Sequence, residues 1–191
     1  MVEWKTVGEI SNIIRGNRVT KSDLIENGQY PVISGGVTPL GYIDKFNREP
    51  MTITIAQYGS AGYIDLQRKR FWANDVCYSI YPSDGILNMY LYYSLVNKQR
   101  EIYSLRTNAV PAHLPQKELS GVQIPIPPLS EQTRIVGILD TFTASIENLK
   151  EQIKLRRKQF NWYLDRFSIE AVNVSRIPTI RVCSERGGIG I

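Results

Sequence analysis

The side chains most often used in catalysis are sparse in this sequence of 191 residues. The one histidine, His113, stands between prolines without a nucleophile-elbow motif nearby, so a Ser-His-Asp triad is not indicated. The two cysteines, Cys77 and Cys183, lie far apart and form no CxxC pair, which argues against a zinc site or a disulfide framework. A GxxxxGK[ST] phosphate loop is absent, and the acidic residues are scattered as surface carboxylates usually are. The sequence therefore predicts no catalytic residues, no metal and no cofactor in this chain.

The charge balance allows nucleic acid as a partner without requiring it. Lys and Arg number 23 against 18 Asp and Glu, a net charge of +5, and 42% of the residues are hydrophobic. The positive excess is spread along the chain, so folding would have to create any basic surface. The N-terminus does not resemble a signal peptide, and no apolar run approaches the roughly 20 residues of a membrane span. We expect a cytoplasmic protein without a membrane partner, built of one domain plus an appendage.

The sequence predicts an α+β fold. A mostly β domain over residues 1–130 would position any functional side chains. Thr6-Val7-Gly8-Glu9 fits a capping box, which predicts a short helix reaching toward Gly16. A second short helix is expected from Lys21 to Glu26. Strand-like segments between glycine turns follow at 30–34, 51–57, 62–66 and 76–81. The spacing of leucines predicts one helix over 86–103, and the prolines of 122–129 favour an extended edge strand.

A long helix is predicted from residue 131 to about 168, with Ser130 as its N-cap and Glu131 in its first turn. A helix over 131–167 would be about 55 Å long. Its apolar side chains recur in alternating steps of three and four residues, the heptad pattern of a coiled coil, and only Arg156 interrupts them. We call this stripe the seam: Leu139, Phe142, Ile146, Leu149, Ile153, Phe160, Tyr163 and Phe167.

The seam predicts a partner helix, because one helix cannot bury such a stripe against itself. Packing against the chain's own domain is the alternative interpretation. A basic group on the same helix suits a contact with DNA or a protein partner, and equally a solvated flank: Lys150, Lys154, Arg156, Arg157 and Lys158. Residues 169–191 lose the period and are expected to be poorly ordered or to form a minor strand.

One run of the sequence resembles a known family. Leu119-Ser-Gly-Val-Gln-Ile-Pro-Ile-Pro-Pro-Leu-Ser-Glu-Gln132, followed by Ile135-Val-Gly-Ile-Leu-Asp140 and the long helix, is similar to the DNA specificity subunit of type I restriction–modification enzymes. The segments 4–10, 55–62, 71–75 and 106–111 support the resemblance, which covers about residues 1–168. It implies that residues 1–130 are a target recognition domain and that 131–168 are a conserved helix for dimerisation and methyltransferase docking.

The same resemblance implies a non-catalytic subunit that binds double-stranded DNA. Members of the family usually carry two domain-plus-helix units, and only one fits here. This half-length form implies that two copies form a homodimer and read a bipartite, inverted-repeat site. The methyl donor, Mg²⁺ and ATP would then bind the methyltransferase and restriction subunits that the dimer recruits.

If the domain reads DNA, its glycine turns and exposed polar residues are the candidate contacts. The amides of Gln57 and Asn108 can pair with adenine, and the guanidinium groups of Arg15 and Arg106 with guanine. Glycine turns can bring backbone N–H groups to phosphates, although tight turning is their commoner use, and His113 can instead serve a loop hydrogen bond. The basic run 68–70 suits phosphate contacts and equally a solvated turn. The predicted DNA-binding residues are Arg15, Ser34, Gly35, Gly36, Gln57, Tyr58, Ser60, Arg68, Lys69, Arg70, Arg106, Asn108 and His113.

Two other function classes stay open from the sequence. A coiled-coil adaptor that binds only protein, without DNA sequence specificity, would bind no duplex at any salt concentration. An enzyme acting alone on DNA would methylate or cut it without partner subunits.

Overall fold

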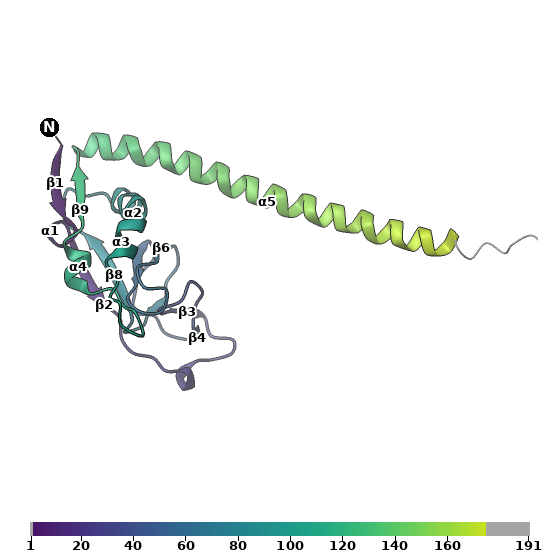
Figure 1. The fold of residues 1–191 in the computed structure, drawn as a ribbon, viewed down its shortest axis with the longest axis horizontal. Coiled ribbons are helices and arrows are strands. Elements are labelled where there is room, and N and C mark those ends of the chain that lie inside the picture. The colour runs from purple at the N-terminus through teal and green to yellow at the C-terminus, as the bar shows by residue number, and fades with distance from the viewer. Residues whose placement is uncertain (1, 175–191) are drawn as a thin grey trace, which may run out of the picture. The chain divides into compact units, whose positions relative to one another are not determined.

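The computed structural model describes residues 2–174 and the side chains up to residue 167. The chain divides into two units, Met1–Asp140 and Thr141–Ile191. The first unit contains three small sheets and several short helices, and the long helix α5 (Leu129–Val174) begins in it. Figure 1 shows these elements, and the expected α+β class, a mostly β domain followed by one long helix, is confirmed.

A four-stranded antiparallel sheet lies at the centre of the first unit, in the order β2-β8-β5-β6. Its strands are β2 (Ser11–Arg15), β8 (Cys77–Pro82), β5 (Thr52–Ala56) and β6 (Ile64–Gln67). Every residue of β5 is buried, as suits a central strand rich in β-branched side chains. The strands expected at 51–57, 62–66 and 76–81 are confirmed.

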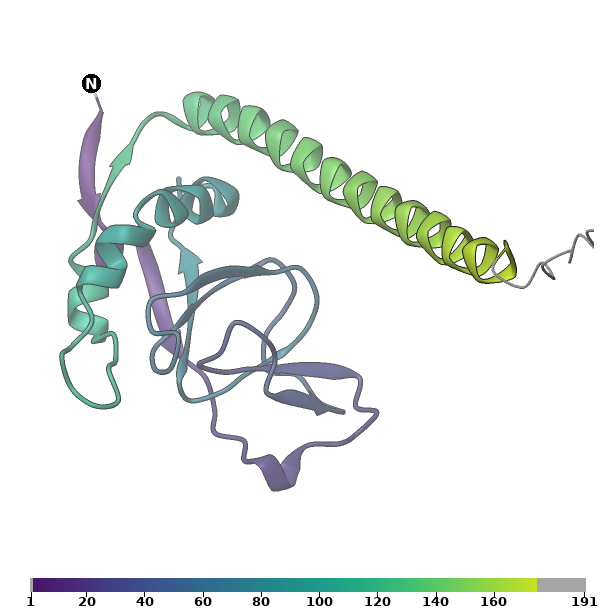
Figure 2. The same cartoon turned by 45° about the vertical axis from the view of Figure 1, so that its right-hand side comes forward.

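Two smaller sheets complete the β structure. In one, β3 (Tyr30–Ile33) pairs antiparallel with β4 (Gly41–Ile43) and parallel with β7 (Trp72–Ala73). In the other, β1 (Glu3–Thr6) pairs with β9 (Gln123–Ile126), so the N-terminal strand lies beside the strand that precedes α5, as Figures 1 and 2 show. The extended segment expected at 122–129 and the strand expected at 30–34 are confirmed.

Short helices cover the central sheet and close the main core. These are α1 (Val7–Ile10), α2 (Asn88–Asn97), α3 (Gln99–Ser104) and α4 (Gln116–Ser120), and α2 packs on β6 and β8. Fully buried side chains of the sheet meet those of the helices: Ile53, Ile55, Ile80, Leu91, Leu95 and Ile102. This burial is the main stabilising term for the first unit.

The first predicted helix is shorter than expected. Its capping box is present, since the Glu9 carboxylate accepts hydrogen bonds from the Thr6 backbone N–H (2.6 Å) and hydroxyl (2.7 Å), and both bonds lower the pKa of Glu9. However, α1 ends at Ile10, and the following residues form β2. The β-branched Ile13 and Ile14 pair with β8. Their spacing predicts a helix, but pairing with the sheet determines their structure.

Two other helix predictions also need correction. The segment 21–26 forms only a 3₁₀ turn, Lys21–Asp23, which Thr20 caps through Asp23. The segment 86–103 contains two helices, because the chain turns at Lys98 (φ −88°, ψ 7°). The Gln99 amide donates to the Gly62 carbonyl (2.6 Å) and accepts from the Ile64 N–H (3.2 Å), which anchors the first turn of α3 to β6.

The long helix begins at Leu129, so Ser130 is not its N-cap as predicted. The Pro128 carbonyl accepts the N–H groups of Glu131 (2.9 Å) and Gln132 (3.0 Å). Gln132 is almost fully buried, and its amide accepts from the Leu87 N–H (3.0 Å) and donates to the carbonyls of Gly85 (3.1 Å) and Pro127 (3.0 Å). These bonds fix the first turn of α5 in the first unit.

The helix continues to Val174, past the predicted end near residue 168. The rest of the predicted tail, 175–191, lies outside the described residues. Within the described part of the chain, no helix has a stretch long and apolar enough to cross a membrane.

Candidate nucleic-acid interface

Three loops gather at one end of the central sheet, where β3 and β5 end and β8 begins. We call residues 34–36, 57–60 and 106–113 the loop cluster. Nine of the thirteen predicted DNA-binding residues belong to it: Ser34, Gly35, Gly36, Gln57, Tyr58, Ser60, Arg106, Asn108 and His113. The fold therefore brings together segments that lie far apart in the sequence.

Two glycines allow the first two loops to touch through their backbones. The Ser60 N–H donates to the Gly35 carbonyl (2.7 Å). A Cβ atom on Gly35 would lie 2.4 Å from the Tyr58 carbonyl oxygen, and Gly59 has φ +70° and the same tight approach from the other side. Only glycine fits such a close approach between backbones. Gly35 and Gly59 are therefore needed for packing as well as for the tight turns.

The third loop is held on the second by His113 and Tyr58. The two residues form a β-bridge, and their rings stack with centroids 5.2 Å apart. The Leu114 N–H donates to the Gln57 carbonyl (2.9 Å), and the Tyr78 hydroxyl donates to the Leu114 carbonyl (3.2 Å). His113 also makes loop hydrogen bonds of its own, because its N–H donates to the Thr107 hydroxyl (3.1 Å).

The predicted base readers differ in their access to solvent. Gln57 is only 8% exposed, so its amide does not reach the surface in this arrangement. Its Oε1 is the one buried side-chain polar atom of the described residues without a hydrogen-bond partner. Asn108 and Arg106 are exposed, and the Arg106 guanidinium donates to the Tyr103 carbonyl (2.8 Å) and lies over the Tyr103 ring.

Arg15 lies next to the loop cluster, at the end of β2. Its guanidinium donates to the Asp75 carbonyl (3.1 and 3.3 Å), and Asp75 follows the buried Asn74. The Asn74 side chain accepts from the Val19 N–H (2.9 Å) and donates to the Ser34 hydroxyl (3.4 Å), which ties the loop at 34–36 to the rest of the domain. Sequence reasoning did not select Asn74 as a positioning residue, because nothing local shows that its partners are 40 and 55 residues away.

The basic run 68–70 lies at the other end of the β5–β6 pair. Gln67 pairs with Thr52, at the opposite end of β5 from Gln57, and the five residue steps from Thr52 to Gln57 span about 16 Å at 3.3 Å per residue. Arg68 and Lys69 are exposed, whereas Arg70 pairs with Glu49 (2.9 Å) and lies over the Phe46 ring. The structure therefore separates this run from the loop cluster.

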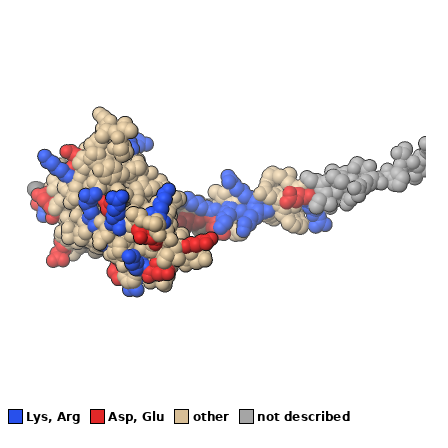
Figure 3. Space-filling view, turned by 90° about the horizontal axis from the view of Figure 1, so that it is seen from below, with Lys and Arg blue, Asp and Glu red and all other residues tan. Residues whose placement is uncertain are grey.

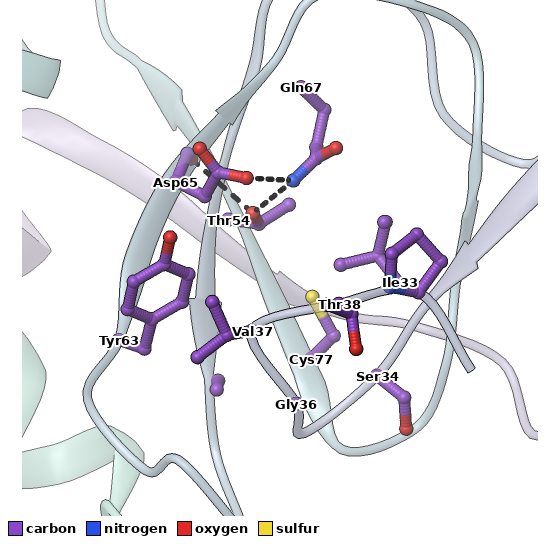
Figure 4. A pocket seen from close by; sticks show the side chains of 12 residues that line it. Ile33, Ser34, Gly36, Val37, Thr38, Thr54, Tyr63, Asp65, Gln67 and Cys77 are labelled. Carbon is purple, nitrogen blue, oxygen red and sulfur yellow. Dashed lines mark hydrogen bonds between the residues drawn. The ribbon is translucent and has the colours of Figure 1, made fainter. Parts of the chain in front are cut away.

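A cavity of about 200 Å³ lies beside the loop at 34–36, and Figure 4 shows its lining. On one wall the Gln67 amide donates to the Asp65 carboxylate (2.9 Å) and the Thr54 hydroxyl (3.2 Å). Cys77 lines another wall, and burial raises the pKa of its thiol to about 12. These polar groups bind one another, which indicates a network that joins β5 to β6.

The second unit exposes its apolar side chains. Seam residues from Phe142 to Phe167 are 48–67% exposed, whereas Leu139 is half-buried in the first unit. The basic group at 150–158 lies on the same helix, and Figure 3 shows Lys and Arg gathered along it. Over the visible face of the first unit, Lys and Arg alternate with Asp and Glu. The described residues hold no group of three or more His, Cys, Asp or Glu side chains that could bind a metal.

The sequence is similar to type I restriction enzyme specificity subunits over most of its length. A family model described as the type I restriction modification DNA specificity domain matches residues 1–157. A putative type I restriction enzyme specificity subunit of Haemophilus influenzae is 30% identical over 95% of this chain and 51% of its own length. The EcoR124I/EcoR124II specificity subunit of Escherichia coli is 30% identical over 86% of this chain and 47% of its own length.

Solved structures resemble the same region. The type I restriction–modification S subunit of M. genitalium has a TM-score of 0.74 at 26% identity, and the match covers 91% of this chain and 48% of that chain. The HsdS subunit of Thermoanaerobacter tengcongensis shares the fold, with a TM-score of 0.60 at 23% identity over 78% of this chain and 39% of that one. The chain spans about half the length of the curated relatives named here. Because the family model matches most of the sequence, the chain belongs to the type I restriction modification DNA specificity family.

Proposed function

We propose that this chain is a non-catalytic DNA-recognition subunit of a type I restriction–modification system. Residues 1–130 would be the target recognition domain, and 131–168 the helix that dimerises and docks the methyltransferase. The observation that carries the proposal is the family match over residues 1–157, which includes the whole loop cluster and most of the seam. Catalysis, the methyl donor, Mg²⁺ and ATP then belong to the partner subunits.

The loop cluster is proposed to contact the duplex. Arg15, Arg106 and Asn108 are exposed beside backbone turns, which suits contacts with both phosphates and base edges. Gln57, Tyr58 and His113 are proposed to hold these loops in position, since their contacts are mostly with one another and with the sheet. Arg68 and Lys69 remain candidates for a separate phosphate contact. Binding should weaken steeply with salt, because phosphate neutralisation releases counterions.

The seam is proposed to bind the same seam of a second copy. Seven of its side chains, Phe142, Ile146, Leu149, Ile153, Phe160, Tyr163 and Phe167, are about half-exposed or more in the single chain. Covering them would remove a large apolar area from water, at roughly 25 cal/mol per Å². A two-fold pair carries two identical recognition domains, so it reads an inverted repeat, and the paired helices fix the distance between its halves.

A second apolar stripe supports recruitment of another subunit. Leu155 and Trp162 are one heptad apart and each 54% exposed. At 3.6 residues per turn they lie roughly 130° around the helix from the centre of the seam, so a seam-to-seam dimer leaves them uncovered. We assign this stripe, with the neighbouring basic group, to the docking of the methyltransferase subunit.

The experiment that tests this proposal is methylation mapping. The chain would be expressed with its methyltransferase subunit in a bacterial host that lacks other methyltransferases, and the methylated positions would be mapped by sequencing. We expect one split motif with two mirror-related halves. The methyltransferase subunit alone serves as the control and should leave the genome unmethylated.

Other results would overturn defined parts of the proposal. An undivided, asymmetric motif contradicts the homodimer. An unmethylated genome, together with a purified chain that retains no duplex at low salt, favours the protein-only adaptor. Methylation or cleavage by the purified chain alone contradicts a non-catalytic subunit.

A further inference from the structure

The tip of the third loop carries an apolar side chain that contributes nothing to packing. Val110 is 100% exposed, the highest value among the exposed large hydrophobic side chains of the described residues. Asn108, Ala109 and Pro111 around it are also exposed. Exposing a valine completely forgoes its burial energy, so the fold of this chain alone gives no reason for an apolar residue there.

The base of this tip is held firmly although the tip is exposed. The Thr107 N–H donates to the His113 carbonyl (2.9 Å), and the His113 N–H donates to the Thr107 hydroxyl (3.1 Å). The same hydroxyl lies 3.0 Å from His113 Nδ1, and the His113 ring stacks on Tyr58. Residues 108–112 therefore form a short finger on a fixed base, which limits the ordering cost of inserting it elsewhere.

The surroundings of the finger favour nucleic acid over protein as its binding partner. A protein interface needs a contiguous apolar patch, usually several hundred Å². The hollow beside the finger is lined largely by polar and cationic side chains instead, among them Ser104, Arg106, Thr107 and Asn108. One apolar tip with a guanidinium and an amide beside it suits a groove of DNA, where the polar groups bind the backbone or base edges and the tip contacts the bases.

We infer that Val110 and Pro111 form an apolar wedge that enters the DNA groove contacted by Asn108 and partly unstacks one base step of the target. Proteins that insert apolar side chains in this way kink the duplex and gain contact area. The step that unstacks most easily is then preferred, which adds specificity without a hydrogen bond to a base. This inference rests on the proposed function. It adds Val110 as a residue that determines specificity without hydrogen bonding to a base.

Fluorescence of 2-aminopurine tests the wedge, because stacking quenches this base. Full-length protein with its methyltransferase subunit would bind duplexes that carry the mapped motif, with 2-aminopurine at one adenine position at a time. Apart from the methylated adenine, which a methyltransferase extrudes from the stack, we expect a rise in fluorescence at one step in each half-site. Val110→Ala should remove that rise and weaken binding about tenfold, since it deletes two methyl groups from the contact. Val110→Ile should keep both signals.

Val96→Ala is the matched control, because Val96 is a partly exposed valine of α2 outside the loop cluster. It should change neither affinity nor fluorescence. Equal fluorescence and affinity for the wild-type and Val110→Ala proteins would overturn the wedge and leave the proposed function standing. A wild-type complex that binds no duplex would overturn both. Since Val110 is fully exposed, its variants should unfold at the wild-type temperature.

Discussion

The two units of this chain differ in the burial of their apolar side chains. In the first unit, Ile55, Leu91 and Leu114 are completely buried. In the second, Phe142, Leu149 and Phe160 are 63%, 56% and 62% exposed. The first unit therefore buries its core within one chain, whereas the apolar side chains of the second are exposed in the single chain. This exposure is what the proposed dimer would remove.

Polar groups show the same contrast. The buried amides of Asn74 and Gln132 are paired, and Gln57 Oε1 is the exception among the described residues. Polar side chains along the second unit make short-range contacts on the helix itself, such as Lys154 to Glu151 and Gln152 to Asn148. Exposed pairs of this kind stabilise a helix by only a few tenths of a kcal/mol. The helix therefore needs partner contacts for most of its stability.

The largest expected effect comes from charging the seam. Leu149→Asp with Ile153→Asp should convert the dimer to a monomer, because each substitution removes about 1.5–3 kcal/mol of burial and places a carboxylate in an apolar interface. The dissociation constant should rise by at least about 1,000-fold. Light scattering measures the mass, and near-ultraviolet circular dichroism should show that the first unit stays folded.

Asn148→Asp with Asn161→Asp is the matched control for charge. These two positions do not flank the seam in the heptad pattern, lie on the same helix and receive the same two carboxylates. This variant should remain a dimer. A dimer of unchanged mass with the seam variant, or a monomer with the control, would contradict the proposed pairing.

The next comparison of the two units uses one buried and one exposed isoleucine. Ile55→Ala removes a fully buried side chain from β5, and we expect it to lower the free energy of unfolding of the first unit by about 2–5 kcal/mol. Ile146→Ala, at a position 52% exposed in the single chain, should leave the first unit's unfolding unchanged and weaken the dimer instead. Urea unfolding and sedimentation at several protein concentrations separate the two effects. Equal losses in both assays would remove the distinction between folding and assembly residues.

The sequence predicts the strands and the long helix well because their signals are local. Alternation and β-branching mark β5 and β8, and a heptad pattern that only Arg156 interrupts marks α5. The predictions fail where contacts with residues distant in the sequence determine the local structure. Ile13 joins a strand because β8 lies beside it, and Lys98 ends a helix where Gln99 binds β6.

The candidate site shows the same limit. Residue types alone select Gln57 and Asn108 as equal adenine readers, yet the fold buries the first and exposes the second. The run 68–70 is the densest basic run of residues 1–130, but it lies at the far end of β5 from the loop cluster. Asn74 and Gln132 have no local pattern, because their roles depend on partners that only the folded chain brings near.

Two glycines of the first unit give a smaller and more local contrast. Gly35→Ala places a Cβ within 2.4 Å of a backbone carbonyl in the loop cluster and should cost about 1–3 kcal/mol of stability. It should also reduce duplex affinity, because the loops must separate. Gly85→Ala meets open space and suffers only the strain of φ +82°, about 1 kcal/mol. Urea midpoints and duplex titration measure both effects, and equal affinities would remove the loop cluster from DNA binding.

The smallest effect at neutral pH belongs to the buried thiol of Cys77. Burial raises its pKa from 9.0 to about 12 in the folded chain, so the folded state keeps its proton when the unfolded state has lost it. Stability is therefore unaffected below about pH 9 and falls by about 1.4 kcal/mol per pH unit above it. In a Cys183→Ser background, urea unfolding between pH 8 and 11 should include this slope. Cys77→Ala should remove only the part due to the thiol, because burial also raises the pKa of Tyr63, Tyr78, Tyr90 and Tyr92. The native thiol should also fail to react with DTNB at pH 8 until denaturant is added. Fast reaction without denaturant would mean that the interior of the first unit opens readily, and the contrast between a closed domain and an open helix would not hold.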